Sequence, residues 1–168
     1  MLENFEYKAT AVFLRDQMHP RRLLMMRRGE DRALAPSRWT GPGGKFDDGE
    51  TEAACASREL GEETNPPLSP ALRPIGRLII NGKRLVSLFT GTAEAGLPPT
   101  SNEGELHWVP IEEVFNRDIL PTTRRFLQEW ASRGWTDSKP FTMKCTRDGD
   151  DNVDAPVQEA VILEGLVW

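Results

Sequence analysis

Three glutamates, Glu59, Glu62 and Glu63, stand within five residues of one another in a stretch that has the composition of a helix. Residues three and four apart share one face of a helix, so these carboxylates project into one small region. Like charges repel there by about 0.2–0.5 kcal/mol per pair. A hard divalent cation with oxygen ligands reverses that repulsion, and Mg²⁺ commonly joins carboxylates to substrate phosphates. The alternative for such a cluster is a solvated acidic helix face.

The sequence around these glutamates predicts a helix over about residues 51–63. Thr51 is a suitable N-cap, because its hydroxyl can accept a hydrogen bond from a free amide of the first turn. Asn65 followed by Pro66 ends the helix, since proline disfavours a helical residue before it and supplies no N–H. Small and apolar residues form a narrow stripe for close approach to a sheet: Ala53, Ala56 and Leu60.

A wider pattern surrounds the cluster. Gly44, five residues, Glu50, seven residues and then the segment 58–63 (RELGEE) resemble the Nudix hydrolase signature GX5EX7REUXEEXGU. Asn65 takes the place of the last glycine of the signature, and Pro66 that of the following apolar residue. The departure leaves every candidate ligand in place. The resemblance implies an α/β fold, the Nudix α/β/α sandwich with a mixed central sheet.

The resemblance also implies a metal-dependent reaction, in which water attacks a nucleoside triphosphate and releases the monophosphate and pyrophosphate. It implies one to three Mg²⁺ ions, with Mn²⁺ as a substitute, held by the Gly43 carbonyl and four carboxylates. The catalytic residues implied are Glu62, Glu59, Glu63, Arg58 and Glu103, and the metal ligands implied are Gly43, Glu59, Glu62, Glu63 and Glu103.

Individual roles within this set follow from the same resemblance. Glu62 or Glu103 accepts the proton of the attacking water, Arg58 orients the carboxylates and Glu50 helps to hold the loop. Glu105 is the rival of Glu103, although strand alternation can point it elsewhere. An exposed loop carboxylate without a catalytic role is the other interpretation of Glu103.

Basic residues are candidates to meet the phosphate oxygens. Four arginines lie in or after the second expected strand: Arg27, Arg28, Arg32 and Arg38. Lys45 directly follows the glycine pair and is a further candidate. For each of these residues alone, a solubilising surface charge is an equal alternative.

Within the family, the chain is most similar to the purine nucleoside triphosphatases of the 8-oxo-dGTP diphosphatase type. Those enzymes read the base with an asparagine and a pair of aspartates after a tryptophan and proline. The corresponding residues here are Thr40, Leu120, Thr122 and Thr123. A threonine hydroxyl can donate and accept but cannot reproduce a carboxyl pair, so a preference for an oxidised guanine stays open.

Length and composition suit one globular domain. With 168 residues, 38% hydrophobic and 28% charged, we expect one Nudix domain over 1–168, its core at about 5–146. Residues 147–168 are an acidic linker and an apolar segment. Its apolar residues 160–168 can form an edge strand, cover the substrate cleft or meet another subunit, and both a monomer and a homodimer are open.

The net charge and the cysteine content limit the binding partners and the compartment that we expect. A net charge of −5 makes long nucleic acid an unlikely partner and fits a small nucleotide bound through metal or local arginines. The two isolated cysteines, Cys55 and Cys145, do not demand a disulfide, which suits a reducing cytoplasm. We expect no membrane partner, because no apolar run is long enough to span a bilayer.

Alternating patterns predict the remaining elements. Strands are expected over residues 6–15, 21–28, 74–80, 84–92, 105–110 and 141–145. Asn81-Gly82 is a strong hairpin signal between two of them. A second helix is expected over 121–133, and a loop over 93–102.

Two functional alternatives accompany the triphosphatase interpretation. One is a Nudix hydrolase of ADP-ribose, a nucleotide sugar or an RNA 5′ end. The other is a non-catalytic Nudix module that binds a nucleotide. The intact trio of Glu59, Glu62 and Glu63 favours an enzyme, because a pure binder has no need of crowded carboxylates.

Overall fold

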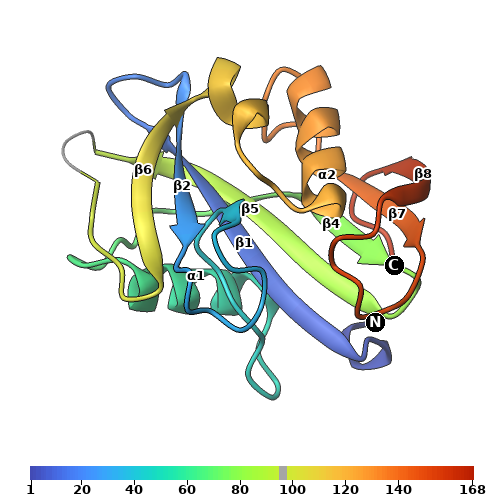
Figure 1. Cartoon of the computed structure of the whole chain (residues 1–168). Coiled ribbons are helices and arrows are strands. Elements are labelled where there is room, and N and C mark those ends of the chain that lie inside the picture. Colours follow the sequence, from blue (N-terminus) through green and yellow to red (C-terminus); the bar gives the residue numbers. More distant parts are fainter. Residues whose placement is uncertain (95–97) are drawn as a thin grey trace.

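A computed structural model describes residues 1–94 and 98–168 of the chain (Figure 1). Residues 95–97, part of the loop expected over 93–102, lie outside the described residues. The elements follow in this order: η1 (Leu2–Asn4), β1 (Tyr7–Asp16), β2 (Arg22–Arg28), β3 (Trp39–Thr40), α1 (Glu52–Glu63), β4 (Arg73–Ile80), β5 (Arg84–Ala93), β6 (Gly104–Pro110), η2 (Ile111–Asn116), α2 (Pro121–Ser132), β7 (Phe141–Arg147) and β8 (Val157–Glu164).

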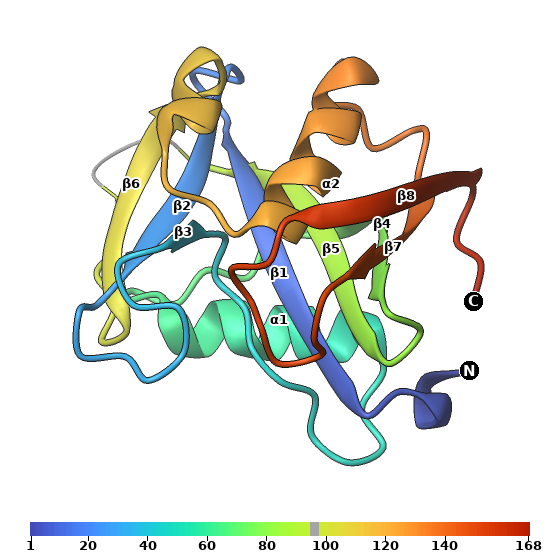
Figure 2. The same cartoon turned by 45° about the vertical axis from the view of Figure 1, so that its right-hand side comes forward.

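The strands form one mixed sheet in the order β3-β2-β1-β5-β4-β7-β8, and β6 pairs with β2 off this path. β1 with β5 and β4 with β7 run parallel, whereas the other neighbours are antiparallel. Figures 1 and 2 show α1 and α2 on opposite sides of this sheet. The expected α/β/α sandwich with a mixed sheet is confirmed.

Strand alternation divides the core into two layers. On β1, Phe13 faces the cluster that contains Phe126 and Trp130 of α2. The next residue, Leu14, faces the cluster that contains Ala56 and Leu60 of α1. All six side chains are completely buried. Ala56 and Leu60 of the predicted stripe therefore pack on the sheet, whereas Ala53 is exposed and Cys55 is buried in its place. This packing leaves the glutamate face of the helix turned toward the loops.

The sequence signals at the ends of α1 and at the β4–β5 turn act as predicted. The Ala54 amide donates to the Thr51 hydroxyl at 3.1 Å, which makes Thr51 the N-cap. The helix ends with Glu63, and Thr64 is extended (φ −118°) rather than left-handed. At the hairpin, Asn81 and Gly82 both adopt positive φ angles, 53° and 68°, as a type I′ turn requires.

A glycine-rich segment beside β1 brings the loop before α1 into the sheet. The Thr10 and Val12 amides donate to the carbonyls of Gly44 and Pro42 at 2.9 and 2.7 Å. A Cβ on Gly43 would lie 2.0 Å from the Thr10 carbonyl oxygen. Only glycine allows this close approach, which fixes Gly43 and Gly44 beside the middle of β1.

The C-terminal segment pairs within its own chain. β8 begins at Val157, before the expected apolar stretch, and pairs antiparallel with β7 from Arg147 to Phe141. Of the three open alternatives for this segment, the structure shows an edge strand. The two-residue strand β3 and the extension of β7 to Arg147 are further departures from the predicted elements.

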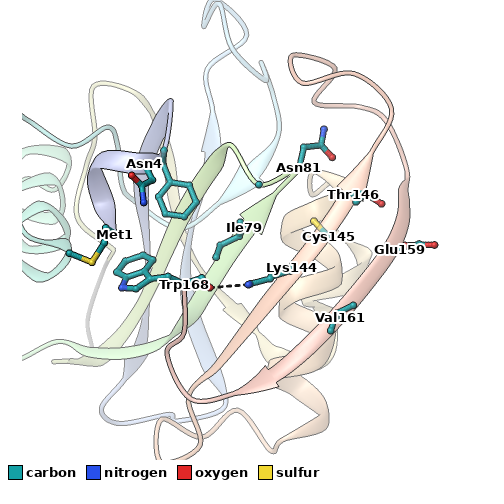
Figure 3. A pocket seen from close by; sticks show the side chains of 12 residues that line it. Met1, Asn4, Ile79, Asn81, Lys144, Cys145, Thr146, Glu159, Val161 and Trp168 are labelled. Atoms are coloured by element: carbon teal, nitrogen blue, oxygen red, sulfur yellow. Dashed lines mark hydrogen bonds between the residues drawn. The ribbon is translucent and has the colours of Figure 1, made fainter.

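The two chain ends lie close together and enclose a cavity of about 420 Å³ against β4, β7 and β8. Figure 3 shows its lining and the hydrogen bond from the Lys144 ammonium to the Trp168 backbone oxygen, 2.9 Å long. The Trp168 ring lies 5.8 Å from that of Phe5, and the Arg77 guanidinium stacks over it at 3.4 Å. Within residues 1–94 and 98–168, the structure contains no helix with the length and apolarity of a membrane span.

Candidate active site

The carboxylates of α1 converge on the glycine pair beside β1. The Gly43 amide donates to Glu63 Oε2 at 2.9 Å, and Glu63 is buried, with 6% of the residue exposed. A Cβ on Gly44 would lie 2.5 Å from the Glu59 carboxyl carbon, so only glycine leaves room for that side chain. Helix α1 thus places the carboxyl groups of Glu59 and Glu63 against the backbone of Gly43 and Gly44, where no side chain stands in the way.

Arg58 ties the cluster to the preceding loop. Its guanidinium makes a two-pronged bond with Glu50, 2.7 Å from Nε to Oε2 and 3.0 Å from Nη2 to Oε1. Nη1 also donates to Glu59 and Glu62, at 2.9 and 3.1 Å. The hydrogen bond from Arg58 lowers the pKa of Glu50 to about 2, so Glu50 is a permanent anion that anchors Arg58. Arg58 therefore contacts Glu50, Glu59 and Glu62 at once, and the orienting role implied for it by the resemblance stays a prediction.

Glu103 completes the acidic group from the loop before β6. Burial, and then a hydrogen bond with the Glu103 carboxyl, raise the pKa of Glu63 to about 8. Burial also raises the pKa of Glu59, despite its bond to Arg58. Glu103 forms an ion pair with Arg32, whose Nη2 lies 3.4 Å from Glu103 Oε1. The negative charges in this region therefore exceed the neighbouring positive ones.

This donor set fits a divalent cation. Carboxylate and carbonyl oxygens are hard ligands, and a bound cation would favour the ionised form of Glu63, whose pKa is raised by burial and by the neighbouring Glu103. Among the residues that the structure describes, no group of three or more His, Cys, Asp or Glu side chains lies in an arrangement that could hold a metal ion. Mg²⁺ typically takes only one or two carboxylates and completes its shell with water and phosphate oxygens, so a full side-chain cage is not required.

A cavity of about 160 Å³ begins at Gly43 and Gly44 and extends between β1, β5, the loop before β3 and the start of α2. Five of the predicted substrate-binding residues line it: Arg28, Arg38, Thr40, Leu120 and Thr123. The acidic group thus lies at one end of a partly apolar cavity. This pairing of charge and cavity is absent from the larger cavity at the chain ends, within the described residues.

The remaining predicted residues lie elsewhere. Thr122 is buried (3% exposed) and is not part of the cavity lining, because one position along α2 turns its side chain toward the core. Arg27 alternates with Arg28 on β2 and lies 3.8 Å from Glu30. The Lys45 ammonium is 5.3 Å from the centre of the Tyr7 ring, at the rim of the cavity. Glu105, the rival of Glu103, contacts His107 at 3.3 Å and is exposed.

Several cavity residues escaped the sequence analysis. Tyr7 and Trp39 supply aromatic surface, and Leu34 and Ala35 come from the polar loop after β2. The tryptophan beside the predicted Thr40 was a usable signal. Tyr7 gave none, because alternation on β1 does not tell which face carries a cavity.

A family model described as the NUDIX domain matches residues 6–130 of the chain. A protein of Mycolicibacterium smegmatis named 8-oxo-(d)GTP phosphatase is 30% identical over 99 residues, 56% of this chain but 30% of that protein's length. A Mycobacterium tuberculosis protein named putative 8-oxo-dGTP diphosphatase 2 is 31% identical over 97 residues, 56% of this chain and 69% of that protein. The chain spans less than a third of the length of the first of these relatives.

Among solved structures, the chain resembles a mutator MutT protein from Bacillus halodurans. The TM-score is 0.68 at 18% identity, over 93% of this chain and 97% of the other. At this identity the likeness concerns the fold. The family match over residues 6–130 shows that the chain belongs to the NUDIX domain family.

Proposed function

We propose that the protein is a metal-dependent pyrophosphohydrolase that cleaves a nucleoside triphosphate to the monophosphate and pyrophosphate. One observation carries this proposal. The acidic face of α1 meets the glycine pair at the end of a cavity whose far walls are Trp39, Thr40, Leu120 and Thr123. A nucleobase at those walls directs its phosphates toward the carboxylates.

The metal would be held by the Gly43 carbonyl and by Glu59, Glu62, Glu63 and Glu103. When bound, Mg²⁺ or Mn²⁺ lowers the pKa of the attacking water and offsets charge on the phosphoryl group. The convergence of several carboxylates on Arg58 and Arg32 supports this assignment. The Gly43 amide, bonded to Glu63, holds that carboxylate in place.

Side chains of the protein position the reacting groups and accept the proton of the attacking water. Water attacks phosphorus, a carboxylate accepts its proton, the phosphoanhydride P–O bond breaks, and pyrophosphate leaves. Glu62, bonded to Arg58 and 60% exposed at its side chain, and the less exposed Glu103 are the two candidates for the base. Arg58 holds Glu59 and Glu62 on one side of the site.

The substrate class follows from the cavity and the relatives. A volume of about 160 Å³ suits a nucleobase rather than a second nucleotide. Thr40 and Thr123 offer hydroxyls that can donate to or accept from base edges. Two relatives carry names that refer to oxidised guanine nucleotides, which makes an 8-oxo-dGTP-like substrate the first to try.

The test is hydrolysis of canonical and oxidised nucleoside di- and triphosphates with Mg²⁺, with identification of both products. We expect monophosphate and pyrophosphate from a triphosphate, and loss of turnover with a chelator. Preferred cleavage of ADP-ribose, a nucleotide sugar or an RNA 5′ end would replace the substrate assignment. Absence of turnover for every diphosphate linkage would favour a binding module.

A further inference from the structure

On β1 and β5, the row of residues that faces the proposed nucleotide cavity continues beyond the cavity to Arg84. The two strands run parallel, with Tyr7 beside Arg84. Most residues of these strands that line the cavity follow the alternation of one sheet face: Tyr7, Ala9 and Ala11 on β1, and Val86 and Leu88 on β5. Thr10 on β1 also lines the cavity. Arg84 is the next member of the β5 row. It does not itself line the cavity, but it lies beside Tyr7, which does, and we therefore call this place the mouth of the cavity.

Two cations flank the aromatic ring at this mouth. The Arg84 guanidinium is 4.7 Å from the centre of the Tyr7 ring, and the Lys45 ammonium is 5.3 Å from it. Lys45 follows Gly44, whose Cα lies against the Glu59 carboxylate. This cationic rim is therefore next to the acidic end of the cavity, where the phosphates of a bound nucleotide are expected.

The present partner of Arg84 is a weakly held carboxylate. Arg84 Nη2 lies 2.6 Å from Asp151 Oδ1 in the loop between β7 and β8, and the Asp151 side chain is 94% exposed. Ion pairs with such exposed groups contribute little to stability, because water screens them well. The loop has other attachments, including Lys83 to Asp150 at 2.7 Å, so displacement of Asp151 does not free it. Figure 2 shows the β7–β8 connection passing in front of β1 and β5.

We propose that Arg84 is a further substrate-binding residue, which donates to a phosphate oxygen of the bound nucleotide, and that Asp151 is a placeholder displaced by that phosphate. The inference rests on the proposed function, since it takes the cavity as the nucleotide site. It predicts opposite consequences for the two partners of one ion pair. Loss of Arg84 weakens binding, whereas loss of Asp151 strengthens it.

The experiment measures binding of an α,β-methylene nucleoside triphosphate in Mg²⁺ by calorimetry, together with KM for the hydrolysable nucleotide. Arg84→Gln should raise Kd and KM about tenfold, the value of one hydrogen bond to a charged group. Asp151→Asn should lower Kd about two- to fivefold, the range of an exposed ion pair. The double variant should match Arg84→Gln alone, because Asp151 acts only through Arg84.

The neighbouring ion pair supplies matched controls. Lys83→Gln and Asp150→Asn remove the same charges one residue away and should leave Kd within about twofold of the wild type, since Lys83 does not stand in the cavity row. Equal weakening by Arg84→Gln and Lys83→Gln, or weakening by Asp151→Asn, would overturn the proposal and assign the pair a structural role. Binding without turnover in the wild type would contradict only the proposed hydrolysis, whereas failure of the wild type to bind would overturn both.

Discussion

The two ends of helix α1 each hold glutamates against an arginine, but the charges balance at only one of them. At the N-terminal end, Glu52 accepts two hydrogen bonds from Arg77, at 2.6 and 3.0 Å, and one from Ser87. At the C-terminal end, Arg58 serves several carboxylates, while the buried Glu63 faces Glu103. The balanced end is an anchor that fixes the helix on β4. The unbalanced end has charge left for a ligand.

The largest effect expected is on turnover at the unbalanced end. Glu62→Gln and Glu63→Gln replace a carboxyl group by an amide of the same shape. We expect kcat to fall about 10²–10⁴-fold in each, because Glu62 is a candidate base and Glu63 a candidate metal ligand. Circular dichroism should show an unchanged fold. The matched control is Glu52→Gln on the same helix, for which kcat should stay within a few-fold. Wild-type rates in both site variants would refute the roles given to them.

The balanced end should respond in stability instead. Arg77→Gln leaves Glu52 without its charged partner, and the two side chains are only 11% and 19% exposed. We expect the free energy of unfolding to fall by about 2–4 kcal/mol, measured by urea denaturation. The kcat of the folded variant should change far less than that of Glu63→Gln. If Arg77→Gln is as stable as the wild type, the anchor is wrongly assigned.

Thermal denaturation with and without Mg²⁺, in the absence of substrate, should distinguish the two ends of α1. A cation that binds only the folded protein stabilises it, by about 2.7 kcal/mol at 100 times its Kd. The melting temperature of the wild type and of Glu52→Gln should therefore rise with Mg²⁺. That of Glu63→Gln should rise less. An equal rise in all three proteins would place the cation elsewhere.

The smallest effect expected is on the stability of the protein at acidic pH. Burial raises the pKa of Glu52, but the hydrogen bonds from Arg77 and Ser87 outweigh it and hold the pKa below its ordinary value. A lowered pKa in the folded state contributes stability that is present above the unfolded pKa, near 4.5, and is lost as the pH falls through the folded value. Between neutral pH and that range, Glu52→Gln should lose less stability than the wild type. Identical acid profiles would remove Glu52 from the pH dependence.

Local patterns predicted the helix that carries the acidic cluster. The Thr51 hydroxyl and the proline after Asn65 define the two ends of α1 through chemistry within a few residues. The fold class was implied by the resemblance to the Nudix signature, and the alternating strand patterns agree with it. These features depend on short-range geometry, which a sequence records directly.

The cavity walls depended on long-range geometry and were predicted only in part. Arg27 and Arg28 look alike in sequence, but strand alternation gives only Arg28 to the cavity. Thr122 and Thr123 are neighbours on α2, but the helix turns Thr122 into the core and only Thr123 toward the cavity. The pairing that makes β3 spans two residues, too few to leave a periodic pattern. No local signal tells which face of a strand will lie over a ligand.

The most direct test of the acidic cluster is a crystal structure with Mg²⁺ and a non-hydrolysable nucleoside triphosphate. We predict the ions beside Glu59, Glu63 and the Gly43 carbonyl, with the phosphates against them and the base between Trp39 and Leu120. Ions bound away from α1, or a nucleotide seated in the cavity at the chain ends, would contradict the proposed site.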